Sequence, residues 1–317
     1  MKLLLIANHT NAAAVEALQA ARLFLESQGV GTESASSGSL LLNDPVYHDL
    51  ATRVGTFDLV CAFGGDGTLL RAARIVAGSA APLLGFNYGT VGFLAGATAA
   101  SLMPALSAAL AGDVVYEQRV LLEARIDFSD GRQTVCQALN ELSIGRSNFG
   151  RSIQLHLSIN GDHLFDLRGD GVIIATATGS TAYALAAGGP LLTPGHRGLC
   201  VVPVCPHPLA TPAIVTAPED VVELRLVPKL GQSPCVYTDG QLVEPSPMHA
   251  GADVRSRDTA KHEHHNNGMA GEQEGGYPLV GAVTVKKSPH VLTLVRYNTP
   301  DFYTSLAALF NGGSHAR

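Results

Sequence analysis

The sequence is poor in charged residues and contains no tryptophan. Only 15% of the 317 residues are Asp, Glu, Lys or Arg, whereas 46% are hydrophobic, so the chain has ample apolar material for a packed core. The formal net charge is −6, which gives no general positive field to attract nucleic acid or an anionic membrane surface. We therefore expect neither of these partners, and an anionic ligand would need a local binding device.

Long apolar runs and cysteine pairs are also missing. No stretch approaches 18 consecutive apolar residues, so the sequence predicts no membrane-spanning helix. The five cysteines are odd in number and lack CxxC spacing, which is typical of thiols that serve as small hydrophobic side chains in a reducing compartment. These absences predict a soluble, cytoplasmic protein.

Short apolar runs alternate with helical patterns in the first third of the chain. We predict strands at residues 2–7, 58–63 and 82–86, and helices at residues 15–28, 68–76 and 101–110. Such alternation is typical of a parallel sheet covered by helices. Residues 1–117 are therefore predicted to form an α/β domain with a parallel sheet.

The pattern changes after Tyr116, where strand-like runs are separated by turn residues such as Asn160-Gly161. The predicted strands lie at residues 122–128, 134–144, 153–159, 172–175, 199–204, 221–227, 236–238, 283–286 and 291–296. Residues 118–299 are therefore predicted to form a mostly β domain that binds the substrate. Helical periodicity returns at residues 302–310, and we expect residues 300–317 to join the first domain.

Residues 255–281 fit neither pattern. They are polar, rich in glycine and histidine, and nearly free of large apolar side chains, so they cannot bury enough surface to offset their ordering entropy. We predict a flexible insert between two strands. His262, His264 and His265 would bind a metal in the alternative interpretation. We favour a solvated loop and predict no protein-bound metal site.

A glycine-rich segment joins the second predicted strand to the helix after it, and it consists of Gly64, Gly65, Asp66, Gly67 and Thr68. Glycines let backbone N–H groups face a ligand, and the helix N-terminus adds a partial positive charge that suits phosphate. Asp66 would repel phosphate unless it holds Mg²⁺ or takes a proton from an attacking hydroxyl. The alternative is an ordinary glycine-rich turn in which Asp66 accepts backbone hydrogen bonds.

Two further polar segments have the side chains that a nucleotide needs. Asn140 and Glu141 offer a neighbouring amide and carboxylate, which are acceptors for sugar hydroxyls; the alternative is a polar pair at a strand end. Residues 178–181 form a hydroxyl-rich turn before a helix predicted from Ala182. Their hydroxyls either cap that helix or bond to adenine and ribose, and Tyr183 would offer a flat apolar face to a base.

The motifs occur in a recognisable order. GGDGT-LLRAAR is followed by GFNYGTVGFL (85–94), NE (140–141), GDGVIIATATGSTAY (169–183), GGP (188–190), CPH (205–207) and DGQ (239–241). GGDG alone also occurs in diacylglycerol-type lipid kinases and 6-phosphofructokinases, but its combination with TGSTAY is much more specific. The sequence resembles the NAD kinase family over nearly its whole length outside residues 255–281.

The resemblance implies a kinase that transfers the γ-phosphoryl group of ATP, or of another donor, to the 2′-hydroxyl of the adenosine ribose of NAD, which gives NADP. It also implies Mg²⁺ or another divalent cation with ATP, and a homodimer or homotetramer. One alternative is a diacylglycerol-type lipid kinase, which should carry a second Gly-Asn-Asp element. The other is a non-catalytic NAD-binding sensor, which would be expected to lose the acid at Asp66.

The resemblance also implies roles for individual residues. Asp66 would be catalytic, either as the base for the 2′-hydroxyl or as a ligand of the cation. Arg151 and Arg168 would bind the dinucleotide phosphates, with a surface arginine as the alternative at each position. Asp170 would contact the nicotinamide side, unless it merely caps a turn. The implied nucleotide-binding residues are Gly64, Gly65, Gly67, Thr68, Arg71, Phe93, Asn140, Glu141, Arg151, Arg168, Asp170, Thr178, Thr181, Ala182, Tyr183 and Gln241.

Overall fold

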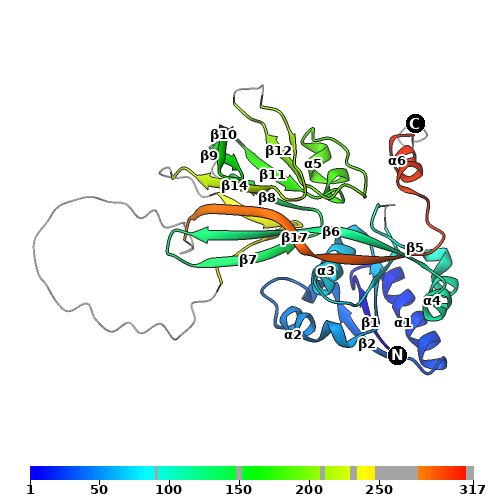
Figure 1. Ribbon diagram of the computed structural model, residues 1–317. Helices are drawn as coiled ribbons and strands as arrows, with labels where there is room; N and C mark the ends of the chain where they lie inside the picture. The colour runs from blue at the N-terminus through cyan, green and yellow to red at the C-terminus, as the bar shows by residue number, and fades with distance from the viewer. Residues whose placement is uncertain (90–91, 148–151, 208–210, 229–233, 247–277, 312–317) are drawn as a thin grey trace, which may run out of the picture.

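The first part of the chain forms a parallel sheet with helices on both faces (Figure 1), as the sequence predicts. The computed structural model describes residues 1–89, 92–147, 152–207, 211–228, 234–246 and 278–311. The parallel strands are, in spatial order, β2 (Gly31–Ser36), β1 (Lys2–Ala7), β3 (Leu59–Gly64), β4 (Leu83–Asn87) and the short β5 (Ala97–Thr98). One face is buried by α1 (Ala12–Ser27) and α4 (Leu102–Ala111), and the other by α2 (Pro45–Arg53) and α3 (Asp66–Val76).

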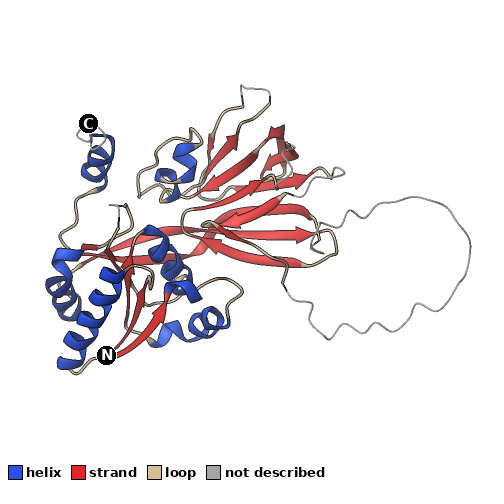
Figure 2. Ribbon diagram, turned by 180° about the vertical axis from the view of Figure 1, so that it is seen from behind, coloured by secondary structure: helices blue, strands red, loops and turns tan. Residues whose placement is uncertain are grey.

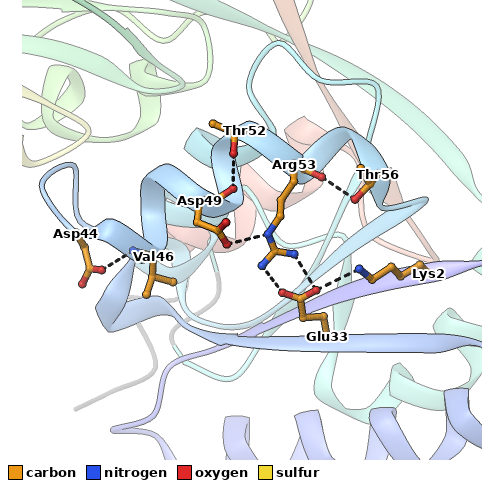
Figure 3. A network of polar contacts seen from close by, with 8 residues as sticks. All are labelled: Lys2, Glu33, Asp44, Val46, Asp49, Thr52, Arg53 and Thr56. Carbon is orange, nitrogen blue, oxygen red and sulfur yellow. Dashed lines mark hydrogen bonds and ion pairs between the residues drawn. The ribbon is translucent and has the colours of Figure 1, made fainter.

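Strand β2 and helix α2 were not predicted because neither has a clear apolar pattern. β2 has no fully buried residue, and Leu50 is the one buried residue of α2. Polar contacts join these two elements instead (Figure 3). The terminal N–H groups of Arg53 on α2 donate to the Glu33 carboxylate on β2, while Asp49 and Lys2 complete the network. An element held by ion pairs at a sheet edge gives little hydrophobic periodicity to read.

The sheet continues beyond β4 into the second half of the chain. Its remaining strands are β17 (Val280–Arg296), β14 (Val221–Leu226), β9 (Ile153–Ile159) and β10 (Asp162–Gly169), with β6 (Val115–Phe128) paired to β17 and β7 (Gln133–Ala138) paired to β6. β17 pairs with β4 in parallel and with β6 antiparallel. The domain boundary predicted at residue 117 therefore falls inside a strand of a sheet that crosses it.

Strand β17 corrects two expectations from the sequence. The runs predicted as separate strands at 283–286 and 291–296 are one long strand, with a register shift between Lys287 and Val291 where it pairs with β6. The insert predicted at 255–281 also ends too late, because Val280 and Gly281 already belong to β17. A polar interruption in one strand looks like a turn when only the sequence is read.

A second, antiparallel sheet packs on the first (Figure 2). Its strands are, in spatial order, β13 (Ile214–Val215), β12 (Cys200–Val204), β11 (Gly171–Ala175), β8 (Glu141–Gly145), β15 (Cys235–Thr238) and β16 (Gln241–Leu242). Their buried side chains share one core with those of β6, β9, β14 and β17, which confirms the mostly β second half. The single strand predicted at 134–144 is wrong: the chain leaves the first sheet after β7 and enters the second at β8.

Short helical segments complete the fold. They are the 3₁₀ turns η1 (Ser37–Ser39), η2 (Val54–Thr56), η3 (Ala99–Ser101) and η4 (Gly179–Thr181), with helices α5 (Tyr183–Ala186) and α6 (Phe302–Asn311). The α6 helix was predicted, and its first residue reaches the first part of the chain, where the rings of Phe302 and Phe93 lie 6.0 Å apart. The rest of α6 stands away from the body (Figure 1). Among the described helices, none is long and apolar enough to cross a membrane.

Candidate functional site

The glycine-rich segment forms the junction between β3 and α3. Gly64 ends the strand, Gly65 is the helix N-cap, and Asp66 is the first helical residue, so α3 begins two residues before its predicted start. The N–H groups of Thr68 and Leu69 donate to the carbonyl of Gly65. A Cβ on Gly64 would collide with the Thr68 side chain, so glycine is required there. The turn places a carboxylate at a helix N-terminus, where the backbone N–H groups favour negative charge.

A backbone segment from another part of the chain covers Asp66. A Cβ on Gly92 would collide with both carboxylate oxygens, and the N–H groups of Phe93 and Leu94 donate to that carboxylate. Burial raises the pKa of Asp66, and the two N–H groups and the charge of Arg296 offset part of that rise. Asp66 is therefore a more basic carboxylate than an exposed aspartate. Phe93, predicted from the sequence, lies at this site through its backbone.

Asn140 and Glu141 lie at the crossing from β7 to β8, and both are buried. The Oδ1 atom of Asn140 and the Oε2 atom of Glu141 have no hydrogen-bond partner within the described part of the chain. Burial, followed by the neighbouring charge of Asp239, raises the pKa of Glu141 to about 7. Buried polar atoms without partners are costly in a folded protein, so these two acceptors are suited to a ligand that brings donors.

Asp239 fixes the backbone of this crossing. Its carboxylate accepts the N–H groups of Leu139 at 2.9 Å, Asn140 at 2.8 Å and Glu141 at 3.2 Å. Burial raises the pKa of Asp239, and those N–H groups together with the charge of Arg74 work against that rise. The sequence motif 239–241 pointed to this turn, but only Gln241 was selected from it. An aspartate followed by glycine reads as a plain turn, so its long-range role was missed.

Arg74 is a second residue that sequence reasoning missed. It lies on α3, is only 9% exposed, and donates through Nη2 to the carbonyl of Thr238 at 2.9 Å. The helix that carries Asp66 therefore also carries the cation that faces Asp239. Arg71, which was predicted to bind the nucleotide, donates through Nη1 to the carbonyl of Ser37 at 2.9 Å.

The hydroxyl-rich turn packs directly on Asn140. A Cβ on Gly179 would collide with the Asn140 carbonyl, and the N–H of Thr176 donates to that carbonyl at 2.9 Å. The predicted residues Thr178 and Asn140 therefore belong to one site. The hydroxyl of Thr181 donates to the Thr178 carbonyl at 3.2 Å, and no side chain caps the start of η4 or of α5, so the capping alternative is wrong.

Residues 182 and 183 follow the hydroxyl-rich turn in the chain. Ala182 occupies the N-cap position of α5, a helix of only four residues, without a side-chain cap. The Tyr183 side chain is 48% exposed, so its ring face is accessible to a base. The structure thus gathers 140–141 and 178–183 around the end of β11.

Other predicted residues lie at the opposite end of β11. Glu141 pairs with Ala175, whereas Gly171 pairs with Gly145, next to Asp170. Four residues of strand separate these ends by about 13 Å. Asp170 forms an ion pair with Arg146, whose Nε lies 3.5 Å from Oδ1.

Arg168, Gln241 and Arg151 are placed separately. Arg168 is exposed and donates through Nε to the Ser152 hydroxyl at 3.1 Å. The Gln241 side chain accepts the N–H of Leu42 at 3.2 Å and so ties β16 to the region after η1. Arg151 lies outside the described residues. Arg168 and Gln241 therefore make these contacts away from the group around Asn140.

In the described ranges, no group of three or more His, Cys, Asp or Glu side chains is placed to hold a metal ion. The histidines at 262, 264 and 265 lie outside those ranges. A magnesium ion that arrives with a triphosphate needs only one or two carboxylates, because phosphate oxygens and water fill its other positions. The partly buried carboxylate of Asp66, beside the glycine segment, fits that need.

Two family models match the chain: the ATP-NAD kinase N-terminal domain over residues 13–114 and the ATP-NAD kinase C-terminal domain over residues 139–262. The NAD kinase of Azoarcus sp. (strain BH72) is 39% identical over 212 residues, which cover 67% of this chain and 70% of the relative. The NAD kinase of Nitrosomonas europaea is 36% identical over 224 residues, which cover 70% and 76%.

Two solved structures share the fold. A yeast NADH kinase complexed with NADH matches with a TM-score of 0.78 at 20% identity, covering 100% of this chain and 89% of that one. An NAD kinase from Archaeoglobus fulgidus in complex with ATP matches with a TM-score of 0.65 at 22% identity, covering 98% of each chain. None of these matches supports the lipid-kinase or sensor alternatives. With both family models matched in order and relatives similar over most of their length, the chain belongs to the NAD kinase family.

Proposed function

We propose that the chain transfers the γ-phosphoryl group of ATP to the 2′-hydroxyl of the adenosine ribose of NAD. The hydroxyl oxygen attacks the γ-phosphorus, the bond between that phosphorus and the β,γ-bridging oxygen breaks, and the products are NADP and ADP. The hydroxyl proton passes to Asp66. The observation that carries the proposal is a carboxylate of raised pKa at the N-terminus of α3, in a member of the NAD kinase family.

Asp66 is proposed as the general base. A ribose hydroxyl is a poor nucleophile, so its proton must leave as it attacks, and a positioned base contributes about 10²–10⁴-fold to such a step. The raised pKa makes Asp66 a stronger base than an exposed aspartate, while the N–H groups of Phe93 and Leu94 hold its carboxylate in place. The glycines at 64, 65 and 67 leave the N-terminus of α3 open to phosphate oxygens.

Asn140 and Glu141 are proposed to bind a ribose of NAD. The Oδ1 atom of Asn140 and the Oε2 atom of Glu141, which have no partner in the described part of the chain, would accept hydrogen bonds from ribose hydroxyls. Thr178 is next to them, and the exposed ring of Tyr183 would stack on a base. The adenosine would thereby lie against the end of β11.

The remaining predicted contacts concern the far end of β11. We propose that NAD lies extended along this strand, so that its other half reaches Asp170 and Arg168. The spacing of about 13 Å between the two ends suits an extended dinucleotide rather than a mononucleotide. The binding roles of Arg71, Thr181, Ala182, Gln241 and Arg151 stay predictions.

Mg²⁺ is proposed to enter with ATP and to be held in part by Asp66. When bound, the ion would neutralise negative charge on the phosphates. Base and ligand are thus competing uses of one carboxylate. The dependence of turnover on Mg²⁺ concentration separates them, because loss of a ligand raises the Mg²⁺ requirement, whereas loss of a base lowers turnover at saturating Mg²⁺.

We also propose where in the cell the enzyme lies and how many copies of the chain it contains. A cytoplasmic location is supported by the five cysteines, all of which are described and none of which is in a disulfide. A homodimer or homotetramer is proposed from the family resemblance. Fractionation of cells with an antibody to the chain tests the location, and light scattering after gel filtration tests the oligomer.

The experiment that tests the function is an assay of purified protein with NAD, ATP and Mg²⁺. We expect NADP and ADP to form in equal amounts. Parallel assays with inorganic polyphosphate in place of ATP, and with NADH in place of NAD, define the donor and acceptor. Absence of NADP with every donor would overturn the proposal.

A further inference from the structure

Arg296 holds the backbone segment that covers Asp66. It is the last residue of β17 and its side chain is only 16% exposed. Nη1 donates to the carbonyl of Ala95 at 2.6 Å, and Nη2 donates to the carbonyl of Phe93 at 3.0 Å. The third donor, Nε, lies 2.8 Å from a carboxylate oxygen of Glu117 on β6. A planar guanidinium makes these three contacts at once, and a lysine ammonium cannot reproduce their geometry.

A single peptide group connects Arg296 to Asp66. The carbonyl of Phe93 accepts a hydrogen bond from Arg296, and the N–H of the next residue, Leu94, donates to the Asp66 carboxylate. That carbonyl and that N–H belong to the same peptide group. Hydrogen bonds arranged in such a chain polarise one another, so the guanidinium strengthens the donor that faces Asp66.

Glu117 joins Arg296 to Arg119, a buried arginine. Oε1 of Glu117 lies 2.8 Å from Nη2 of Arg119, which is only 5% exposed. Burial raises the pKa of Glu117, but the charges of Arg119 and Arg296 outweigh burial and leave its pKa below the ordinary value. The network of two guanidinium groups and one carboxylate therefore carries one net positive charge.

The other end of this network reaches the hydroxyl-rich turn. Nη1 of Arg119 donates to the Thr178 hydroxyl at 3.4 Å, a long hydrogen bond. The Nε atom of Arg119 is buried and has no partner among the described residues. Side chains on β6 and β17 thus join the cover of Asp66 to the turn that packs on Asn140.

We propose that Arg296 is a positioning residue for Asp66, and that Glu117 and Arg119 connect this support to Thr178. Arg296 fixes the segment at Phe93–Ala95 so that its N–H groups meet the carboxylate. Glu117 orients both arginines, because one of its carboxylate oxygens contacts Arg119 and the other contacts Arg296. The inference rests on the proposed role of Asp66 as the base.

The test uses Arg296→Met and Arg296→Lys in the full chain. We expect kcat to fall about 10–100-fold in both variants, the range for a misplaced catalytic group, with a smaller change in KM for NAD. In Arg296→Met the acid limb of the pH–kcat profile moves to higher pH, because Asp66 loses a nearby positive charge and its oriented donor. Arg296→Lys keeps the charge, so its limb moves less although its kcat also falls.

A readout that needs no turnover accompanies the kinetics. The carboxyl carbon resonance of Asp66, assigned by its loss in Asp66→Asn, is titrated in the wild-type chain and in both variants. Its midpoint should rise in Arg296→Met. The control is Arg125→Met, which removes an exposed arginine on β6 that pairs with Asp127 at 3.4 Å, and it should leave both profiles unchanged.

The outcomes separate this inference from the proposed function. If Asp66→Asn turns over normally, Asp66 is not the base and the function proposal fails at that residue. If Asp66→Asn is impaired while a folded Arg296→Met keeps the wild-type kcat, pH profile and Asp66 midpoint, only the positioning inference is overturned. A fall in kcat with an unchanged Asp66 midpoint would also overturn it, because that result indicates a purely structural role.

Discussion

Asp66, which is partly buried, and Glu141, which is buried, are two acids with opposite surroundings. Burial raises the pKa of both, yet Asp66 faces two N–H donors and the charge of Arg296. Glu141 faces another carboxylate, and its buried Oε2 atom has no partner among the residues that the structure describes. The two N–H donors and Arg296 therefore favour the ionised form of Asp66 against the effect of burial. Glu141 has a pKa of about 7, and its deprotonated form is completed only by a ligand that donates hydrogen bonds. We therefore propose Asp66 for proton transfer and Glu141 for binding.

The largest effect is expected from replacing Asp66, the proposed base. Asp66→Asn removes the base but keeps the size of the side chain, so we expect kcat to fall by about 10²–10⁴-fold. Affinity for NAD should change little, since Asn140 and Glu141 are untouched. Steady-state kinetics and calorimetric titration with NAD measure both quantities. Near-normal kcat in this variant would show that Asp66 is neither the base nor an essential cation ligand.

The pH dependence of stability sharpens the contrast from the side of Glu141. The folded pKa of about 7 lies above the ordinary value of 4.5, so the protonated form stabilises the fold below pH 4.5 and this stability is lost as the pH rises through 7. Glu141→Gln cannot ionise. Its free energy of unfolding relative to wild type should therefore rise by about 2–3 kcal/mol between pH 4.5 and pH 8.

Urea unfolding of the ligand-free proteins at both pH values measures that difference. Glu16→Gln, which removes an exposed carboxylate on α1, is the matched control and should show no such rise. A pH-independent difference for Glu141→Gln would mean that Glu141 ionises as freely in the folded chain as in the unfolded one.

Binding is the third expected difference between the two acids. Glu141→Gln should weaken NAD binding by about 1–3 kcal/mol, because a charge-assisted hydrogen bond to a sugar hydroxyl becomes a neutral one. ATP binding should be nearly unchanged. Calorimetric titration with each nucleotide decides the matter. An unaltered affinity for NAD would return Asn140 and Glu141 to the role of a polar pair at a strand end.

The smallest effect is expected far from both acids. Deleting residues 261–276 should leave kinase activity and melting temperature nearly unchanged. The described residues on either side are anchored to the same β6–β7 hairpin, where Ser246 bonds to Thr134 and Leu279 bonds to Ser129. Shortening a loop whose ends are anchored together changes its closure free energy by only about 0.6 kcal/mol per halving.

Activity, oligomer mass and zinc-dependent melting of the deletion and the full chain measure this effect. A several-fold loss of activity, a changed oligomer, or a melting shift with zinc in the full chain alone would show that His262, His264 and His265 have a function.

Much of the fold could be predicted, because apolar strands and amphipathic helices are local patterns. The run at 2–7 and the junction at 64–68 are examples, since a buried strand, glycines and a helix start follow one another in the sequence. β2 and β10 were missed because both are largely exposed and polar. The union of two predicted strands in β17 was missed because a register shift cannot be told from a turn without its partner strand.

The sequence indicated the side chains proposed to act on the ligands, but not the groups that hold those side chains in place. Asp66, Asn140 and Glu141 stand in short motifs that show their chemistry directly. The cover of Asp66 is made by backbone N–H groups of Phe93 and Leu94, and any residue type carries such a group. The role of Asp239 likewise depends on three N–H groups brought to it by tertiary structure. Contacts through the backbone leave no mark on composition or spacing.

The most direct measurement asks which of the two acids is the base, since both have a raised pKa. It is the pH dependence of kcat for the wild-type chain, Asp66→Asn and Glu141→Gln, at saturating NAD, ATP and Mg²⁺. We expect Glu141→Gln to keep the acid limb of the wild-type profile, whereas the residual turnover of Asp66→Asn should have lost it. A limb that disappears in Glu141→Gln and persists in Asp66→Asn would contradict the account and make Glu141 the base.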